Sequence, residues 1–365
     1  MFFSIFKWKQ FNWLLFTLMI ALIVLGLVLQ SSLSSITFKK QLIFVFLGLF
    51  LFFLISFFDY RIFRSFAYYF YLLTLFLLLI LLFLGTTQRG VKGWFSFGPL
   101  NFQPTELVKL SVIIVLARFW QELKRPLRFS HLLLSFILIL PAIILVLLQP
   151  DLGPSLILLF IAFGLALMVS PYKKQILILI MILIAAGFFS WFFLKDYQQD
   201  RILSYLNLKK DPFGRDYQIN QSIIAIGSGK IFGRGFGEAS QSQLRFLPEG
   251  KTDFIFAVLA ENFGFLGSFL FLALYFFFLF HLIKISKRVY DNFALVLILG
   301  ISLYFFSQLL INLGMCLGLL PVIGLSLPFL SYGGSSLLIS MISVALIQSA
   351  LIHQPPHQLG GLEKE

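Results

Sequence analysis

Long uninterrupted runs of apolar residues constrain the fold of this chain more than any other feature. Stretches of about 18 or more apolar residues recur along its length, and a helix of that length can cross the hydrocarbon core of a bilayer. The chain is 59% hydrophobic and only 12% charged, whereas about a quarter of the residues of a typical globular domain are charged. We therefore expect an all-α, polytopic membrane protein.

The apolar runs predict about ten transmembrane helices. They fall near residues 11–29, 38–58, 66–85, 104–120, 131–148, 153–170, 175–194, 253–283, 293–314 and 333–352. The polar segment from Lys195 to Thr252 is too long for a turn and predicts a large extracytoplasmic loop between helices 7 and 8. Nothing in the sequence suggests a repeat or a soluble domain, so residues 1–365 are expected to form a single membrane domain. The first run has no cleavage site of the small-x-small type and is expected to be a span rather than a signal peptide.

The distribution of Lys and Arg predicts the orientation, because cytoplasmic loops of membrane proteins are enriched in these residues. One set of alternate loops is the richer in them, and it contains Lys7, Lys9, Arg61, Arg64, Arg118, Lys124, Arg125, Arg128, Lys173, Lys174, Lys284, Lys287 and Arg288. We therefore expect both termini in the cytoplasm and the Lys195–Thr252 loop outside. That loop is itself basic, but long loops follow the charge rule poorly.

The net charge of +13 does not imply nucleic-acid binding, because anchoring to membrane lipids at the cytoplasmic face explains much of it. A few cations of the external loop are candidates for an anionic headgroup such as a phosphate. The glycine-rich stretch AIGSGKIFGRGFG lacks the Ser or Thr of a Walker motif, since Ile231 follows Lys230. We interpret this stretch as a close-packed loop rather than a phosphate cradle.

Polar residues inside the spans are costly in hydrocarbon, so each is a candidate functional residue. Glu106 and Lys109 are three residues apart on one helix face, where they can pair with each other or contact a substrate. Asp151 is interpreted as a helix cap. The stretch LPVIGLSLPFLSYGGSS, which includes Ser331, is rich in Pro and Gly and predicts a re-entrant loop that lines a site.

The stretch FLPEGKTDFIFAVLAENFG places one acid, Asp253, at the mouth of a long apolar run and another, Glu261, eight residues later. On a helix, Asp253, Ala257, Glu261 and Gly264 would form one small and polar stripe, which would face protein or water. Asp253 can either cap this helix or act as a catalytic base, and the residues alone leave both interpretations open.

The sequence resembles the SEDS family (shape, elongation, division and sporulation proteins), and most of all its RodA branch. The blocks that carry the resemblance are RGVKGWFSFGPLNFQPTELVKL, LLQPDLGPS, DYQINQSIIAIGSGKIFGRGFG, FLPEGKTDFIFAVLAENFGFLG and NLGMCLGLLPVIGLSLPFLSYGGSS. They cover nearly the whole chain in order. One departure is Asn262, because the family usually has a second glutamate after Glu261.

The resemblance implies a peptidoglycan glycosyltransferase of the bacterial cell membrane that polymerises lipid II for cell elongation and rod shape, releasing undecaprenyl diphosphate. A lipid II flippase and the division-associated FtsW type are the alternatives. The resemblance also implies a class B penicillin-binding protein as partner, and no nucleic acid. Asp253 matches the essential aspartate of the family, which suits a general base acting on a sugar hydroxyl.

The leaving diphosphate needs positive charge, which Arg or Lys or a divalent cation such as Mg²⁺ or Mn²⁺ can supply. The candidate substrate-binding residues are Arg89, Lys92, Lys109, Arg201, Arg215, Glu261 and Ser331.

Overall fold

Long apolar helices form most of this computed structural model, which describes residues 10–88, 90–97, 100–122, 129–169, 215–244 and 246–354, with a few isolated positions between 174 and 199. The long helices are α1 (Trp13–Leu33), α2 (Ser35–Phe57), α4 (Ala67–Leu84), α5 (Pro104–Glu122), α6 (Phe129–Leu148), α7 (Leu152–Val169), α12 (Ile255–Ser286), α13 (Asn292–Cys316) and α14 (Gly334–Ile352). Of these, 8 are long and apolar enough to cross a membrane. The exception is α5, which carries Glu106, Lys109 and Arg118.

The predicted helical, multi-pass architecture is confirmed, and nine of the predicted spans correspond to these helices. The boundaries differ by a few residues at most positions, as expected for sequence-based assignments. The remaining predicted span, 175–194, lies almost entirely outside the described residues.

The core of the bundle is formed by α5, α13 and α14, which pack against one another and are mostly buried. The surrounding helices α2 and α4 expose mainly apolar side chains, among them Ile43, Phe46 and Phe50 of α2. A bundle in lipid has this distribution, because the hydrocarbon solvates apolar side chains whereas polar groups must find partners inside.

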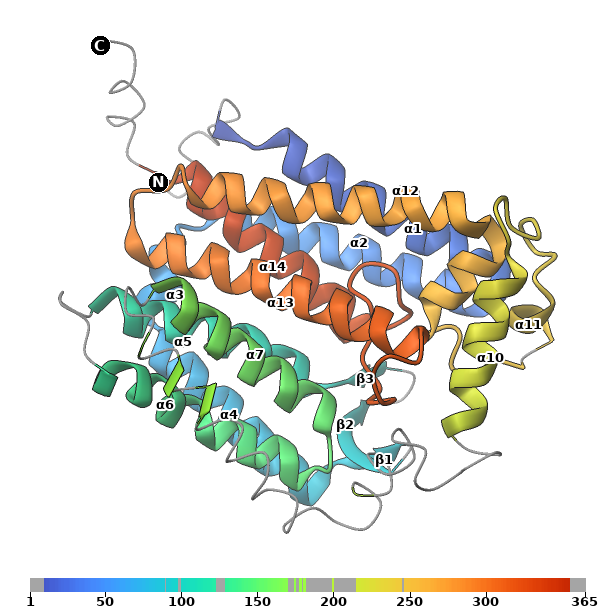
Figure 1. Ribbon diagram of the computed structural model, residues 1–365. Coiled ribbons are helices and arrows are strands. Elements are labelled where there is room, and N and C mark those ends of the chain that lie inside the picture. Colours follow the sequence, from blue (N-terminus) through green and yellow to red (C-terminus); the bar gives the residue numbers. More distant parts are fainter. Residues whose placement is uncertain are drawn as a thin grey trace.

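One end of the bundle carries three short strands and two helices (Figure 1). They are the antiparallel strands β1 (Thr86–Gln88), β2 (Val91–Phe97) and β3 (Leu100–Phe102), and the helices α10 (Arg215–Ser228) and α11 (Ser240–Gln243). The loop between α13 and α14 reaches the same end. The sheet was not predicted from the sequence and is an addition to the all-α class.

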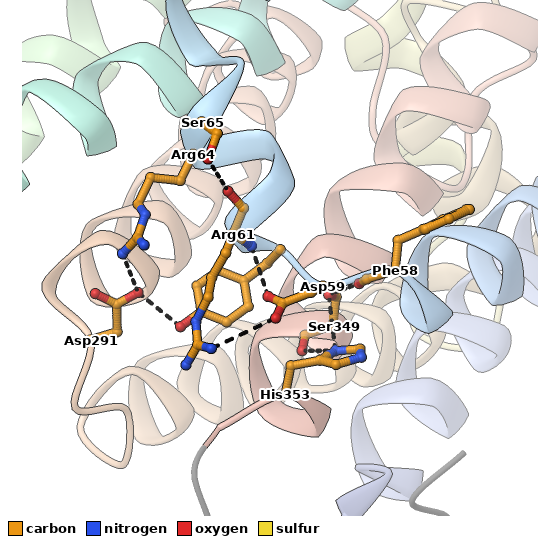
Figure 2. Close-up of polar contacts among 9 residues, drawn as sticks. Phe58, Asp59, Arg61, Arg64, Ser65, Asp291, Ser349 and His353 are labelled. Carbon is orange, nitrogen blue, oxygen red and sulfur yellow. Dashed lines mark hydrogen bonds and ion pairs between the residues drawn. The ribbon is translucent and has the colours of Figure 1, made fainter. Parts of the chain in front are cut away.

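The opposite end of the bundle holds α3 (Arg61–Ser65) and the turn between α12 and α13 (Figure 1). Figure 2 shows the polar contacts that join these segments. Asp291 accepts hydrogen bonds from the Tyr60 hydroxyl (2.8 Å) and from the first turn of α13 at Phe293 N (3.3 Å). It also pairs with Arg64 at 3.8 Å. Burial and the bond to Asp291 raise the pKa of Tyr60 to about 12, so the hydroxyl remains a donor at neutral pH.

Helix α12 is interrupted at Gly264, whose backbone is non-helical with φ 65°. In an unbroken helix, Phe265 N and Leu266 N would bond to the carbonyls of Glu261 and Asn262. Instead these amides donate to Lys230 O (2.8 Å) and Ile231 O (3.0 Å), while Glu261 O and Asn262 O accept from Arg234 N (2.9 Å) and Gly235 N (3.2 Å).

The glycine-rich stretch therefore inserts its own backbone into the break in α12. A Cβ at Gly233 would lie 2.1 Å from Asn262 O, and Gly233, Gly235 and Gly237 all have positive φ. The interpretation of this stretch as a close-packed loop is confirmed for residues 229–237, whereas residues 225–228 end helix α10. Close contact between two backbones explains Gly229 and Gly233, and positive φ explains Gly235 and Gly237.

Candidate functional site

A cavity of about 830 Å³ opens at the end of the bundle that carries the short elements. Its walls come from segments far apart in the sequence. They comprise the first turns of α2 (Thr37, Lys40, Phe44), the sheet (Val91, Trp94, Asn101), the start of α5 (Gln103, Glu106), Asp151, Gln218, residues 248–253, and residues 322–326 and 332–336. The block RGVKGWFSFGPLNF thus contributes through its strands, and the predicted non-helical segment before α14 is confirmed as a wall of a cavity.

Asp253 lines this cavity. The predicted helical stripe is wrong at both ends, because α12 begins only at Ile255, with Phe254 at the cap position, and its helical path breaks at Gly264. Asp253 lies in the turn that precedes the helix, and its amide donates to Glu249 O at 3.1 Å. Gly324 on the facing loop is close enough that a Cβ there would lie 3.6 Å from Asp253 Oδ2.

Glu261 is completely buried and lies away from the cavity wall. Its carboxylate accepts from Gln241 N (2.7 Å) and Ser242 N (3.0 Å) and also from the Ser242 hydroxyl. These amides are in the first turn of α11, where backbone N–H groups have no acceptor within the helix and a negative charge is favourable. The neighbouring Asn262 Oδ1 accepts a hydrogen bond from Gly237 N at 3.3 Å, so both side chains hold the loop between α10 and α12 against α12.

Two predicted substrate-binding cations have protein partners instead of positions on the cavity wall. Lys92 donates to Leu82 O (2.7 Å) and Phe83 O (3.0 Å), near the C-terminal end of α4. Lys109 is buried, pairs with Glu106 at 2.7 Å and lies 5.3 Å from the centre of the Tyr304 ring. Of the two interpretations of Glu106 and Lys109, the ion pair between them is therefore present in the structure.

Asp151 immediately precedes α7, and its side chain lines the cavity. Ser331 is buried just behind the wall, where its hydroxyl donates to Thr252 O at 2.6 Å and accepts from Leu327 N at 2.8 Å. Arg89, Arg201 and the side chain of Arg215 lie outside the described residues, so their predicted roles stay predictions.

Lys40 and Lys251 are the cations that line the cavity within the described part of the chain; sequence reasoning missed Lys40 and counted Lys251 only among the basic residues of the long loop, without singling it out. Lys251 is two residues from Asp253, so its place beside the candidate acid could have been recognised from the sequence. Lys40 reaches the site only through the packing of α2 against the loop that precedes α14. Nothing in its local sequence separates it from a membrane-boundary lysine.

Four acids, Glu106, Asp151, Glu249 and Asp253, also line the cavity. Across the part of the chain that the structure describes, no three His, Cys, Asp or Glu residues are placed to hold a metal ion together. Such a cavity fits a magnesium-like ion only with one or two carboxylates, the rest of its ligands being water and phosphate oxygens.

Comparison with known proteins gives concordant matches. A family model described as cell cycle protein, FtsW/RodA/SpoVE, matches residues 7–355. The chain is 39% identical over 272 residues to peptidoglycan glycosyltransferase MrdB of Escherichia coli, covering 74% of this chain and 73% of the relative. It is 36% identical over 351 residues to MrdB of Helicobacter pylori, covering 94% of this chain and 91% of the relative.

Solved structures agree with these sequence matches. A chain from a peptidoglycan synthase complex that coordinates polymerisation and crosslinking superimposes with a TM-score of 0.81 at 32% identity, covering 95% of this chain and 100% of that chain. The rod shape determining protein RodA of Thermus thermophilus gives a TM-score of 0.71 at 29% identity, covering 96% of this chain and 100% of that chain.

Proposed function

We propose that Asp253 is the general base that activates the attacking sugar hydroxyl in this chain, which belongs to the FtsW/RodA/SpoVE family and is a peptidoglycan glycosyltransferase. The observation that carries the proposal is the position of Asp253 on the wall of the cavity, outside any helix and opposite Gly324. The transporter alternative has no comparable support, since the relatives are named glycosyltransferases.

The proposed substrate is lipid II, a disaccharide-pentapeptide on undecaprenyl diphosphate. The 4-hydroxyl oxygen of one sugar attacks the anomeric carbon of another, and the bond from that carbon to the diphosphate oxygen breaks. Asp253 takes the hydroxyl proton, and undecaprenyl diphosphate leaves with the bonding electron pair. General-base assistance of this kind contributes about 10²–10⁴-fold to a rate.

The departing diphosphate develops negative charge that fixed cations can stabilise. Lys40 and Lys251 are the described cations on the cavity wall, and we assign the diphosphate to them, together with the sequence-predicted Arg89, Arg201 and Arg215. Lys92 and Lys109 fit this role less well, because each already has a protein partner. A divalent cation bound by the diphosphate and one or two carboxylates would supply further positive charge.

The cellular role we propose is polymerisation during elongation, with a class B penicillin-binding protein supplying the crosslinking activity. Support comes from the similarity to the rod shape determining protein RodA and to a chain of a synthase complex that couples polymerisation with crosslinking. FtsW proteins are also similar, with 36% identity over 271 residues to the one from Haemophilus influenzae, so the division-associated role is the second candidate.

The multi-pass chain is proposed to have both termini in the cytoplasm. The charge distribution supports this orientation. Figure 1 shows that α1 begins and α14 ends at the end of the bundle opposite the strands that help to line the cavity. The cavity then opens at the outer surface, where a lipid-linked sugar can reach it.

The decisive experiment compares the wild-type protein with Asp253→Asn, each purified with its class B partner and supplied with lipid II and Mg²⁺ or Mn²⁺. Asn retains the shape of Asp but does not accept a proton at neutral pH. We expect the variant to insert and bind its partner while polymerisation falls by about 10²-fold or more. Near-normal glycan strands on a gel from Asp253→Asn would refute the general-base role.

A further inference from the structure

The turn that carries Asp253 is held by the buried side chains of other elements. Lys251 O accepts from Gln30 Nε2 of α1 at 3.1 Å and from Tyr332 N at 2.9 Å. Thr252 O accepts from the Ser331 hydroxyl, and Asp253 O accepts from Asn312 Nδ2 of α13 at 2.8 Å. The successive carbonyls of residues 251–253 are therefore all bonded to groups outside the turn.

Asn312 joins the two walls of the cavity that face each other at Asp253. Its amide donates one hydrogen to Asp253 O and the other to Leu325 O at 2.7 Å, next to Gly324. The Cys316 sulfur lies 3.8 Å from both the Asn312 side-chain oxygen and Asp253 O. The Asn312 side chain is completely buried and lies outside the cavity lining, so it does not contact a substrate in the cavity and can affect one only by fixing the position of the backbone.

Ser331 makes the corresponding connection one residue earlier. Its hydroxyl bonds to Thr252 O and to Leu327 N, and its own carbonyl accepts from Gln41 Nε2 of α2 at 3.2 Å. The Gln41 oxygen in turn accepts from Gly333 N at 3.3 Å. The loop that faces Asp253 is thus fixed to α2 as well as to the turn.

We propose that Asn312 and Ser331 are positioning residues that set where the Asp253 carboxylate lies relative to the bound sugar. This inference rests on the general-base role of Asp253 proposed above. Because Asp253 precedes the first residue of α12, the hydrogen bonds of that helix do not fix its carbonyl. The side chains at 312 and 331 take over that function, and Ser331 acts through the turn instead of binding the substrate.

The first test replaces Asn312 by Leu, which has nearly the same size but no donor. The rate of lipid II polymerisation is measured against substrate concentration, with the class B partner present. We expect kcat to fall about 10–100-fold while KM stays within about twofold, since a displacement of about 1 Å can cost that much rate without loss of binding. An unchanged kcat, or a loss confined to KM, overturns the proposal for Asn312.

The matched control is Tyr71→Phe. The Tyr71 hydroxyl also donates from one span to a carbonyl of another, Leu138 O at 2.7 Å, and the residue is buried away from the cavity. Loss of this bond should leave kcat within about twofold of wild type. A fall in kcat equal to that of Asn312→Leu would show that any lost buried bond has the same effect, and would overturn the positioning role.

The second test uses Ser331→Ala and Ser331→Thr and also serves if Asn312→Leu does not accumulate. Thr keeps the hydroxyl and should retain most of kcat, whereas Ala should lower kcat about tenfold. Equal rates for Ala and wild type overturn the role of Ser331.

A double variant separates this proposal from the one on which it rests. If Asn312 acts only through Asp253, then adding Asn312→Leu to Asp253→Asn should cause no further loss of the residual rate. A multiplicative loss would mean that Asn312 acts independently of Asp253, and the positioning role would fail. If Asp253→Asn itself polymerises normally, the general-base role fails first and the positioning role fails with it.

Discussion

The role of an acidic residue on the cavity wall depends on the groups that surround it as well as on its chemical type. The chain has 15 acidic residues, and the structure places four of them on the cavity wall. The Asp253 carbonyl accepts from the buried Asn312 amide, the neighbouring Thr252 carbonyl accepts from the Ser331 hydroxyl, and the Asp253 carboxylate faces a glycine. A side chain at Gly324 would therefore alter the surroundings of the Asp253 carboxylate.

Gly324→Ala should reduce polymerisation about tenfold or more, because a strained loop beside Asp253 shifts the reacting groups. Gly324 has φ 70°, a conformation that costs Ala about 1 kcal/mol. Gly237→Ala is the control, since Gly237 has φ 80° and no atom within 4 Å of an added Cβ. Both variants should lose similar thermal stability in detergent, but only Gly324→Ala should lose activity in the lipid II assay.

Lys109→Met tests the ion pair against substrate binding. Removing the ammonium leaves the buried Glu106 carboxylate without its 2.7 Å partner, and breaking a buried pair in this way costs about 3–5 kcal/mol. We expect a marked fall in the unfolding temperature, most of which the double variant Glu106→Gln with Lys109→Met should restore. Normal stability of Lys109→Met combined with a tenfold rise in KM for lipid II would instead assign Lys109 to the substrate.

At the scale of elements, the interrupted helix α12 and the glycine-rich loop form one unit. Backbone carbonyls of the loop accept from the amides that the break at Gly264 leaves without helical acceptors, and backbone amides of the loop donate to the carbonyls left without helical donors. Glu261 adds a second attachment by binding the start of α11. The loop between α10 and α12 is therefore anchored to the helix that follows Asp253.

Gly233→Ala should detach this loop from α12. Its Cβ would lie 2.1 Å from the Asn262 carbonyl oxygen, and the loop must withdraw and give up its bonds to the break, at a cost of about 2 kcal/mol or more. Hydrogen–deuterium exchange should then accelerate at the amides of Phe265 and Leu266. Gly90→Ala, at φ 81° with no atom within 4 Å, should leave exchange there unchanged, and equal exchange in Gly233→Ala would contradict the anchoring.

At the scale of the whole molecule, the two ends of a membrane-spanning bundle lie on opposite sides of the membrane. The sheet, α10 and α11 lie at one end, where residues of the sheet line the cavity, and α3 and the turn between α12 and α13 lie at the other (Figure 1). The proposed mechanism requires the cavity end to face outward. That requirement can be checked independently of activity.

Single cysteines should report the orientation, because the native Cys316 is buried and should not react. Phe232→Cys, in the glycine-rich loop where Phe232 is 79% exposed, should react with a membrane-impermeant maleimide in spheroplasts. Lys287→Cys, at the exposed turn after α12, should react only after permeabilisation. The reverse pattern would place the cavity in the cytoplasm and exclude polymerisation at the outer surface.

The sequence by itself determined the membrane class and nearly all span positions, and it marked Asp253, at the mouth of an apolar run, as a candidate for either a helix cap or a catalytic base. These features depend on local properties: the length of apolar runs, the cost of a charge in hydrocarbon and the spacing of glycines. The close-packed glycine-rich loop and the non-helical segment before α14 were predicted for the same reason. Arg89, Arg201 and Arg215 were instead chosen from the blocks that resemble the family and from their expected outer positions, and their roles stay predictions.

Tertiary structure alone decided which polar residues from different spans meet. Lys109 pairs with Glu106 three residues away on the same helix, as the sequence already allowed, whereas Lys40 was not a candidate until α2 packed against the loop before α14. Asn312 lies in an apolar helix 59 residues from Asp253 along the chain, so its sequence context carries no sign of the bond. Contacts of this range form only when separate spans pack together, because the hydrogen bond depends on the distance between two atoms rather than on either residue.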